Sequence, residues 1–476
     1  MTVPMYTQAG WTAAGAPLLW ASVSFSIAVF VFERWLDLRQ HRRIAERGAL
    51  VPDHLRELVA AIDADAPKAA PGAAVEETLL KRLEAKGAAT KEYSLAKSRF
   101  RFVTTTFSLA QALVQVGTGF YPYMWDVAVG LVCGAGADDA CWRASEIRVA
   151  VVFAGLLTLV ETVISLPFSV YSTFRIEQQH GFNTMTYSLF AADAGKSLAL
   201  TGVIGAPVLS LLLAIVRSVG PQRLASYVAA FMFTVSLFFA TIYPVAIQPL
   251  FNKYEPLAAG PLREKIEKLA ASVNYPLYKL FTVDGSKRSS HSNAYMYGFF
   301  KFKRIVLFDT LLKQASDDEI TAILAHELGH WSYGHTVTGF AITQGYFFVA
   351  FTAFSKAMGY ADMYAAFGFA ATAGASATAG APVVVGLILF FSTLWEPADH
   401  FISFCLTANT RRMEFQADAY AADLGRAAPL QRGLVKITFE NLGMLDPDPF
   451  YSAYHHSHPP LMERLAAIDE KANKSK

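Results

Sequence analysis

Residues 322–335 read AILAHELGHWSYGH, and the run TVTGFAITQGYFFVAF at 336–351 that follows contains no charged residue. The first stretch contains a His-Glu-x-x-His motif, which holds a metal ion on one face of a helix. The second stretch has the composition of a membrane-spanning helix. Together the two stretches indicate a membrane protein with a hydrolytic metal site at the membrane boundary.

The composition of the whole chain agrees with a membrane protein. Of 476 residues, 53% are hydrophobic and only 17% are charged, and the mean hydropathy is +0.31. Such values predict a polytopic protein whose partner is the lipid bilayer. The net charge of +2 provides no basic surface, so no nucleic-acid partner is expected. Three cysteines exclude a disulfide scaffold and a cysteine-rich metal site.

Length and apolar content predict a mainly α fold with seven transmembrane helices. The segments centre on Ala14–Phe32, Val103–Trp125, Val149–Phe174, Ser197–Val216, Leu224–Ile247, Thr336–Ser355 and Pro382–Cys405. The third contains Glu161, which must face protein or water rather than lipid.

Lys and Arg in the loops predict the orientation. None precedes the first span, whereas residues 33–101 are rich in both. The N-terminus is therefore expected outside, and residues 33–101 form a long cytoplasmic loop. We expect an integral membrane protein, of the bacterial inner membrane or the endoplasmic reticulum. Cys133 and Cys141 fall in an outside loop, where a disulfide can persist, although so short a loop can also prevent the required geometry.

The segment 251–335 has the pattern of a small α+β domain. A helix is expected over 262–273, and strands over 280–283, 293–297 and 304–308. Ser316 and Glu319 form a capping box. The helix that they start is expected to continue through the metal motif into the sixth span. The expected organisation is five spans in 1–250, the metalloprotease segment in 251–335, two spans in 336–405 and a catalytic segment in 406–476.

The metal motif predicts a zinc site. His326 and His330 are four positions apart, so a helix places both imidazoles on one face. Glu327 is placed to act as general base. The alternative interpretation is a helix with two interfacial histidines and an exposed glutamate.

A third ligand is expected in the sequence TRRMEFQADAY at 410–420. Glu414 and Asp418 are four positions apart on one helix face, directly after the last span. Glu414 would complete a site of two histidines and one glutamate. Asp418 would accept the ring N–H of a ligating histidine and fix its tautomer. Such a carboxylate pair is by itself also typical of a solvated helix face.

Three further polar residues lie near the expected site. His458, in HHSHPPLMERL at 455–465, can donate to the oxyanion of a tetrahedral intermediate, or is an ordinary loop histidine. Asn293 can help an edge strand pair with an extended substrate, or only opens a strand. His335, five residues beyond His330, is expected to point elsewhere.

Several motifs resemble the type 1 integral-membrane CAAX prenyl proteases. They are RIEQQHGFN at 175–183, SKRSSHSNAYMYGF at 286–299, HELGHW at 326–331, RRMEFQADAY at 411–420 and YHHSHPPLMERL at 454–465. The resemblance implies seven helices around a water-filled chamber and a gluzincin-like zinc domain. It places zinc on His326, His330 and Glu414, makes Glu327 the base, and puts Asn293 and His458 near the substrate. Members of the family remove the last three residues of proteins whose C-terminal cysteine carries a prenyl lipid.

Two other functions remain open at the level of sequence. One is a quality-control metalloprotease that degrades misfolded membrane proteins with the same metal motif but fewer spans. The other is a transporter or scaffold in which zinc is only structural. A structural zinc site needs a fourth protein ligand, but no Cys lies close in sequence and His335 is expected to point elsewhere.

Overall fold

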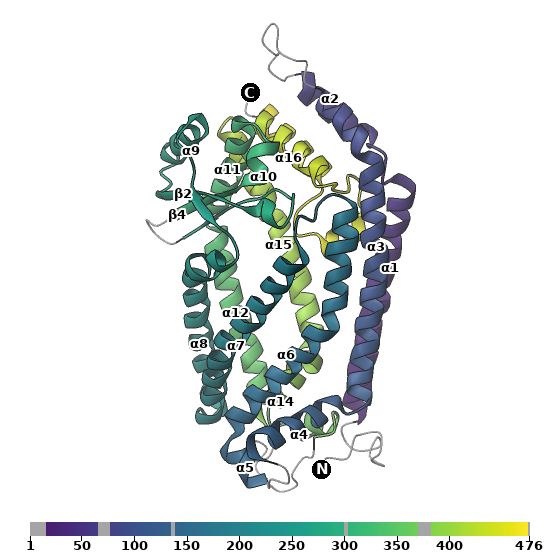
Figure 1. Cartoon of the computed structure of the whole chain (residues 1–476), viewed down its shortest axis with the longest axis vertical. Coiled ribbons are helices and arrows are strands. Elements are labelled where there is room, and N and C mark those ends of the chain that lie inside the picture. Colours follow the sequence, from purple (N-terminus) through teal and green to yellow (C-terminus); the bar gives the residue numbers. More distant parts are fainter. Residues whose placement is uncertain (1–15, 65–76, 135–138, 299–302, 370–381, 475–476) are drawn as a thin grey trace.

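Long helices stand side by side along the molecule, and a small sheet with covering helices lies at one end, beside the C-terminus (Figure 1). The computed structural model describes residues 16–64, 77–134, 139–298, 303–369 and 382–474. The α-helices are α1 (Ala16–Arg47), α2 (Asp53–Ala64), α3 (Leu79–Gly117), α4 (Phe120–Cys133), α5 (Asp139–Ala144), α6 (Glu146–Tyr171), α7 (Tyr187–Ser218), α8 (Pro221–Ile242), α9 (Pro261–Ser272), α10 (Asp309–Gln314), α11 (Asp317–Ser332), α12 (His335–Ala357), α13 (Ala361–Ala365), α14 (Val383–Leu389), α15 (Glu396–Asp423), α16 (Ala427–Glu440), α17 (Pro449–His455) and α18 (Leu461–Lys474).

Five helical rods among the described residues are long and apolar enough to cross a membrane. They are Ala16–Arg47, Glu146–Glu177, Tyr187–Ser218, Pro221–Leu250 and His335–Ala357. One of these rods ends in the π-helical η3 (Ser172–Glu177), and another contains the π-helical η4 (Tyr243–Ile247) before its last turn, the 3-10 helix η5 (Gln248–Leu250). These five coincide with five of the seven expected spans.

The other two expected spans are broken helices. In the segment Val103–Trp125, α3 ends at Gly117, and Gly119 has a φ of 66°, which redirects the chain into α4. The segment Pro382–Cys405 is divided among α14, the π-helical η7 (Phe390–Leu394) and α15. The count of seven spans therefore stays a proposal.

The expected long loop is largely helical. α1 continues to Arg47, α2 follows, and α3 begins at Leu79, while residues 65–76 lie outside the described residues. A buried apolar cluster joins this region to the C-terminal segment, through Leu55, Leu83 and Phe439 among others. The ion pair between Arg39 and Asp448 adds to this contact, with 2.8 Å between Nη2 and Oδ2. This packing explains why α1 and α3 extend outside the apolar residues of their expected spans.

The strands are β1 (Tyr254–Pro256), β2 (Leu277–Val283), β3 (Ala294–Tyr297) and β4 (Lys303–Phe308). β2, β3 and β4 confirm the three predicted strands, whereas β1 was not predicted. The four strands form one sheet in the order β1-β2-β4-β3, in which β2 and β4 are parallel and the other pairs antiparallel. Ile305 and Leu307 of β4 are fully buried in the core that also contains α9 and α11. The sheet thereby fixes the helix that carries the metal motif.

The expectation of one helix running from Ser316 through the sixth span is wrong. α11 ends at Ser332, and Gly334 adopts φ 67° before α12 begins at His335. A left-handed residue ends an α-helix because the next amide no longer points along the axis, and glycine adopts this conformation without a Cβ penalty. The metal helix and the membrane helix are thus two rods with their own directions.

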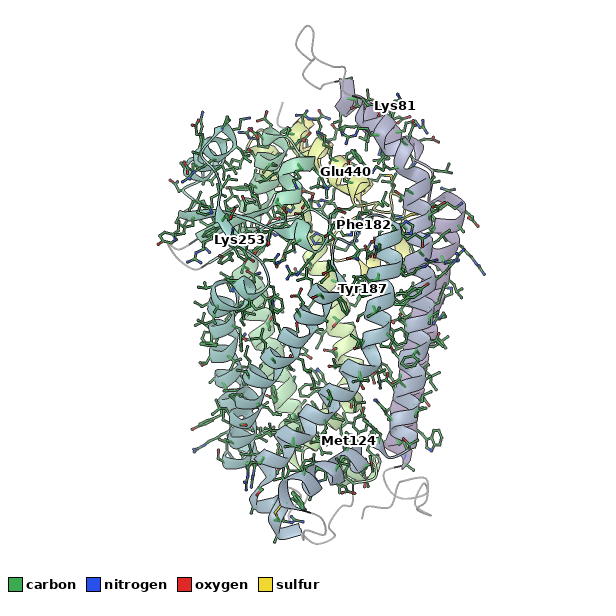
Figure 2. All side chains as sticks on the ribbon, in the orientation of Figure 1. Lys81, Met124, Phe182, Tyr187, Lys253 and Glu440 are labelled. Carbon is green, nitrogen blue, oxygen red and sulfur yellow. A yellow bond between two sulfur atoms is a disulfide. The ribbon has the colours of Figure 1, made fainter. Side chains whose placement is uncertain are left out.

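A second core lies at the opposite end of the molecule, around Trp125, Phe153 and Phe354. Figure 2 shows Met124, a member of this core, far from Glu440 at the other end. Here Cys133 and Cys141 form a disulfide, with their Cα atoms 6.1 Å apart, so the short loop does allow the geometry.

Candidate metal centre

The metal motif sits on α11, which begins as predicted. The Ser316 hydroxyl accepts from the Glu319 amide, and the Glu319 carboxylate accepts from the Ser316 amide at 2.8 Å. His326 and His330 follow on one face. Between them, Gly329 allows α15 to come close, because a Cβ on this glycine would lie 2.9 Å from the Cα of Ala417. The close approach brings the next helix to the two histidines.

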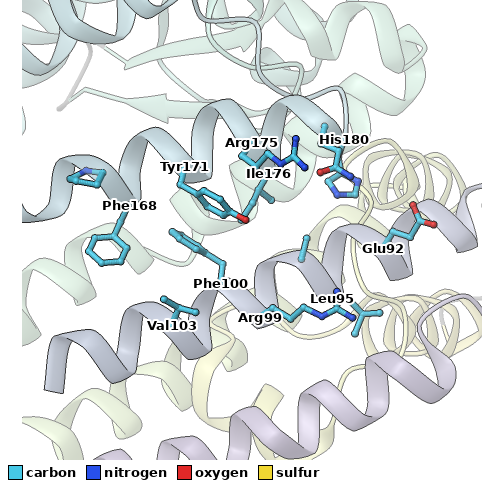
Figure 3. A pocket seen from close by; sticks show the side chains of 13 residues that line it. Glu92, Leu95, Arg99, Phe100, Val103, Phe168, Tyr171, Arg175, Ile176 and His180 are labelled. Atoms are coloured by element: carbon cyan, nitrogen blue, oxygen red, sulfur yellow. The ribbon is translucent and has the colours of Figure 1, made fainter. Parts of the chain in front are cut away.

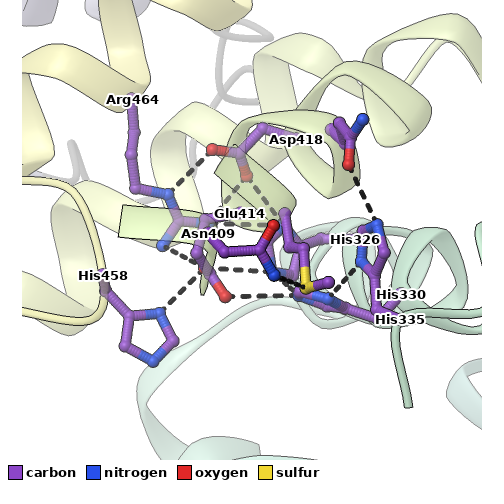
Figure 4. Close-up of polar contacts among 10 residues, drawn as sticks. His326, His330, His335, Asn409, Glu414, Asp418, His458 and Arg464 are labelled. Carbon is purple, nitrogen blue, oxygen red and sulfur yellow. Dashed lines mark hydrogen bonds and ion pairs between the residues drawn. The ribbon is translucent and has the colours of Figure 1, made fainter. Parts of the chain in front are cut away.

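α15 provides the third side chain of the cluster. Ligand atoms of His326, His330 and Glu414 all lie within 4.8 Å of one another (Figure 4). The two Nε2 atoms are 3.2 Å apart, and the Glu414 carboxylate lies 3.3 Å from Nε2 of His330 and 3.6 Å from Nε2 of His326. Tetrahedral ligands at about 2.0–2.1 Å from zinc are themselves about 3.3 Å apart. The donor set and spacing therefore fit zinc.

Asp418 orients His326. Its Oδ1 lies 2.7 Å from Nδ1 of His326, so the Nδ1–H donates to the carboxylate and leaves Nε2 as the ligating atom. Arg464 of α18 in turn donates from Nε and Nη2 to the same carboxylate, at 2.8 and 2.7 Å. Burial would raise the pKa of Asp418, but Arg464 and His326 bring that pKa below its ordinary value. The carboxylate stays charged between its two partners.

His330 also has a partner behind it, which corrects the expectation that His335 points elsewhere. Nδ1 of His330 lies 2.9 Å from Nδ1 of His335, and Nε2 of His335 lies 3.1 Å from Oε1 of Gln416. The Gln416 oxygen can only accept, so His335 carries its proton on Nε2. Nδ1 of His335 then accepts from His330, whose Nε2 is left free for a metal.

Glu327 is half-buried beside the cluster. Burial raises its pKa, and the charge of Glu414 raises it further, while His326 and His330 oppose the shift. A raised carboxylate pKa suits a general base, which must accept a proton near neutral pH.

His458 approaches the cluster from the loop before α18. Its Nδ1 lies 2.8 Å from Oε2 of Glu414, while its side chain is 66% exposed. The Glu414 carboxylate raises the pKa of His458 against the effect of burial. Burial would raise the pKa of Glu414 itself, but contacts with His330 and His458 bring it well below its usual range. His458 thus contacts the cluster on one side and is exposed to solvent on the other.

Asn293 precedes β3, which is an edge strand that contacts α11. Its Oδ1 accepts from the Ala294 amide at 2.8 Å, and its carbonyl accepts from the Phe308 amide at 3.1 Å. These contacts fix where β3 starts. The part Asn293 would take in binding a substrate stays a prediction.

Arg464, His335 and Gln416 were not predicted as parts of the centre. His335 and Gln416 are 81 positions apart in the sequence, and Arg464 lies 46 positions beyond Asp418. No local spacing joins such residues, because they meet only when α11, α15 and α18 pack. In the structure Asp418 is buried, and a buried carboxylate requires a cationic partner, but the sequence alone does not show that burial.

Comparison with known proteins gives consistent results along the whole chain. Residues 41–253 match the family described as CAAX prenyl protease N-terminal, five membrane helices, and residues 256–472 match peptidase family M48. A CAAX prenyl protease 1 homolog of Oryza sativa subsp. japonica is 42% identical over 96% of this chain and 99% of its own length. CAAX prenyl protease 1 of Saccharomyces cerevisiae is 38% identical over 95% of both chains. The crystal structure of S. mikatae Ste24p is similar with a TM-score of 0.81 and 37% identity, covering 95% of this chain and 99% of that chain.

Proposed function

The chain belongs to peptidase family M48, among the CAAX prenyl protease 1 homologues, and on that basis we propose that it is a zinc-dependent membrane endopeptidase. The observation that carries the proposal is the spacing of His326, His330 and Glu414, which suits one tetrahedral zinc ion with a fourth position open to substrate.

Each residue of the centre has a chemical task in this proposal. Zinc held there supplies Lewis-acid chemistry to the scissile carbonyl. Glu327 takes a proton from the attacking water and returns it to the leaving amine. His458, exposed beside Glu414, donates to the developing oxyanion. Asn293 fixes the start of edge strand β3, along which an extended substrate backbone can pair.

The proposed substrates are proteins with a prenylated cysteine near the C-terminus, from which the last three residues are removed. The full-length similarity to proteins named CAAX prenyl protease 1 supports this specificity. The membrane location supports it as well, because a prenyl chain keeps its protein at the bilayer. The metal centre is proposed to face the cytoplasm, with the disulfide end on the oxidising side.

The decisive experiment measures bound zinc together with cleavage products. The purified protein is offered a farnesylated four-residue CAAX terminus, the same peptide without the lipid, and unfolded casein, and products are identified by mass spectrometry. We expect one zinc per chain and release of the C-terminal tripeptide from the farnesylated peptide. Efficient cleavage of casein instead would indicate a quality-control protease. A chain that binds zinc and cleaves none of the three would indicate a structural metal.

A further inference from the structure

A groove of about 800 Å³ lies between α3 and the end of α6 with η3 (Figure 3). Its volume is in the range of pockets that bind small ligands. No residue of the metal centre lines it. The proposed hydrolysis therefore leaves this groove without a role.

The groove occupies one face of α3. Its α3 residues 92, 95, 96, 99 and 103 recur at helical spacing. A second hollow of about 700 Å³ is lined by α3 residues 93, 94, 97, 98, 101 and 104, which lie on the opposite face, together with α1 and the C-terminal segment. Phe100 and Ile176 line both hollows, so these two side chains stand between them. The groove thus faces away from α1 and the C-terminal segment.

The two ends of the groove differ in chemistry. Aromatic side chains form one end, where Phe100 stacks on Tyr171 with 5.3 Å between ring centroids and Phe168 lies beside them (Figure 3). Arg99 and Arg175 lie toward the other end, which also contains Glu92 and His180. Among the described residues, neither guanidinium forms a hydrogen bond or an ion pair with the protein. Two arginines that pair with no carboxylate in the described part of the chain outnumber the single Glu92 at this end, so an apolar groove with this end suits an anionic amphiphile.

The groove also lies at the end of an apolar helical rod that is long enough to cross a membrane. Phe168 and Tyr171 are in the last turns of the apolar rod Glu146–Glu177, and Val103, 60% exposed, is at the same level of the neighbouring helix. Arg175 is one turn beyond Tyr171, at the end of the rod nearer the metal centre. Basic pockets between membrane helices at this level bind anionic lipid headgroups.

We propose that this groove binds one anionic phospholipid from the leaflet on the metal-centre side. Its phosphate lies between Arg99 and Arg175, and an acyl chain follows Phe168, Tyr171 and Val103. Phe100 and Ile176 separate this lipid from the second hollow, on the opposite face of α3. The bound lipid is therefore a structural lipid and not a substrate that moves toward the metal centre.

The test is lipid binding to the full-length, zinc-loaded protein in neutral detergent. Phosphatidylglycerol and phosphatidylcholine with identical chains are titrated, and bound lipid is counted by native mass spectrometry. We expect one phosphatidylglycerol per chain, preferred at least tenfold over phosphatidylcholine, since each basic residue contributes to binding anionic headgroups. Arg99→Gln/Arg175→Gln should abolish the preference. Arg42→Gln/Arg223→Gln removes two exposed arginines outside the groove and should leave it unchanged.

A second pair of variants tests the apolar end without changing charge. Val103→Trp fills the groove at an exposed position and should weaken phosphatidylglycerol binding, whereas Val163→Trp, equally exposed on α6 but outside the groove, should not. Equal binding of the two lipids by the wild type, or an unchanged preference in Arg99→Gln/Arg175→Gln, would overturn the proposal. A raised KM for a farnesylated peptide in that variant, with lipid binding unchanged, would also overturn it and make the groove a substrate site.

Discussion

At the scale of single residues, the metal centre depends on the groups behind its ligands. Each histidine uses Nε2 toward the cluster and Nδ1 toward a partner, which is Asp418 for His326 and His335 for His330. Partners of this kind fix the tautomer and the ring orientation of a ligand before the metal arrives. The affinity for zinc should therefore respond to residues that never touch it.

Arg464→Lys tests this dependence. The lysine keeps the charge beside Asp418 but cannot reproduce the two-pronged contact from Nε and Nη2. We expect the Kd for zinc to rise about tenfold, the lower end of what loss of an outer partner costs. Zinc affinity is measured by competition with a chelator. Arg43→Lys, which alters a remote pair with Asp446, is the matched control, and identical affinities in both variants would refute the dependence.

Local spacing in the sequence predicted the cluster that the structure brings together, namely His326, His330 and Glu414, with Asp418 behind it. These residues fall in two helices, in each of which i, i+4 spacing places side chains on one face. The contact of His335 with His330 could not be predicted in this way. It depends on the break at Gly334, which turns the first residue of α12 back toward α11.

At the scale of elements, the centre is an interface between two helices whose backbones nearly touch. Gly329 of α11 faces Ala417 and Tyr420 of α15 at distances that leave no room for a side chain. The distance between α11 and α15 therefore sets the distance between Glu414 and the two histidines. A methyl group at this position has to separate Glu414 from the two histidines.

Gly329→Ala is expected to weaken zinc binding and to destabilise the fold by about 1–3 kcal/mol, as overpacking does in a filled interior. The measurements are zinc affinity and thermal unfolding. Gly339→Ala in α12 is the control, because a Cβ there meets no atom within 4 Å and alanine favours a helix. Normal zinc affinity in Gly329→Ala would show that the helices adjust without moving the ligands.

Element boundaries were harder to predict than element types. Hydropathy locates apolar stretches, but it cannot show that a single glycine adopts a left-handed conformation. Gly119 and Gly334 both adopt this conformation, and each lies where one helix ends and the next begins. Three of the four strands were predicted, and the clearest of them, β2, ends at the turn pair Asp284-Gly285. β1 spans only three residues and has no such signal.

At the scale of the whole molecule, the metal centre joins parts that are far apart in the chain. α11 rests on the sheet, α15 continues from the last expected span, and α18 packs on α16 beside α2 and α3. Zinc at this point would tie the membrane helices to the C-terminal segment. The sequence could not predict this packing, because the clusters form between segments separated by more than 300 residues.

Removal of the metal tests whether zinc stabilises the contact between the membrane helices and the C-terminal segment. Zinc-loaded wild type should unfold several degrees above the chelator-treated protein, since a ligand at about 1,000 times its Kd adds about 4 kcal/mol. Glu414→Ala should unfold near the metal-free temperature and gain nothing from added zinc. Glu470→Ala removes an exposed carboxylate paired with Lys474 and should behave as wild type. An unchanged unfolding temperature in Glu414→Ala would argue against the tie.

The central claim, that Glu327 is the base of a zinc endopeptidase, is tested most directly by Glu327→Gln. The amide has nearly the same shape and takes no part in the proposed ligand set, so the variant should retain one zinc per chain and the wild-type unfolding temperature. It cannot accept a proton, so release of the tripeptide from a farnesylated peptide should fall by at least about 10²–10⁴-fold. Zinc content and cleavage are measured on the same preparation. Full zinc occupancy with cleavage near the wild-type rate would contradict the account.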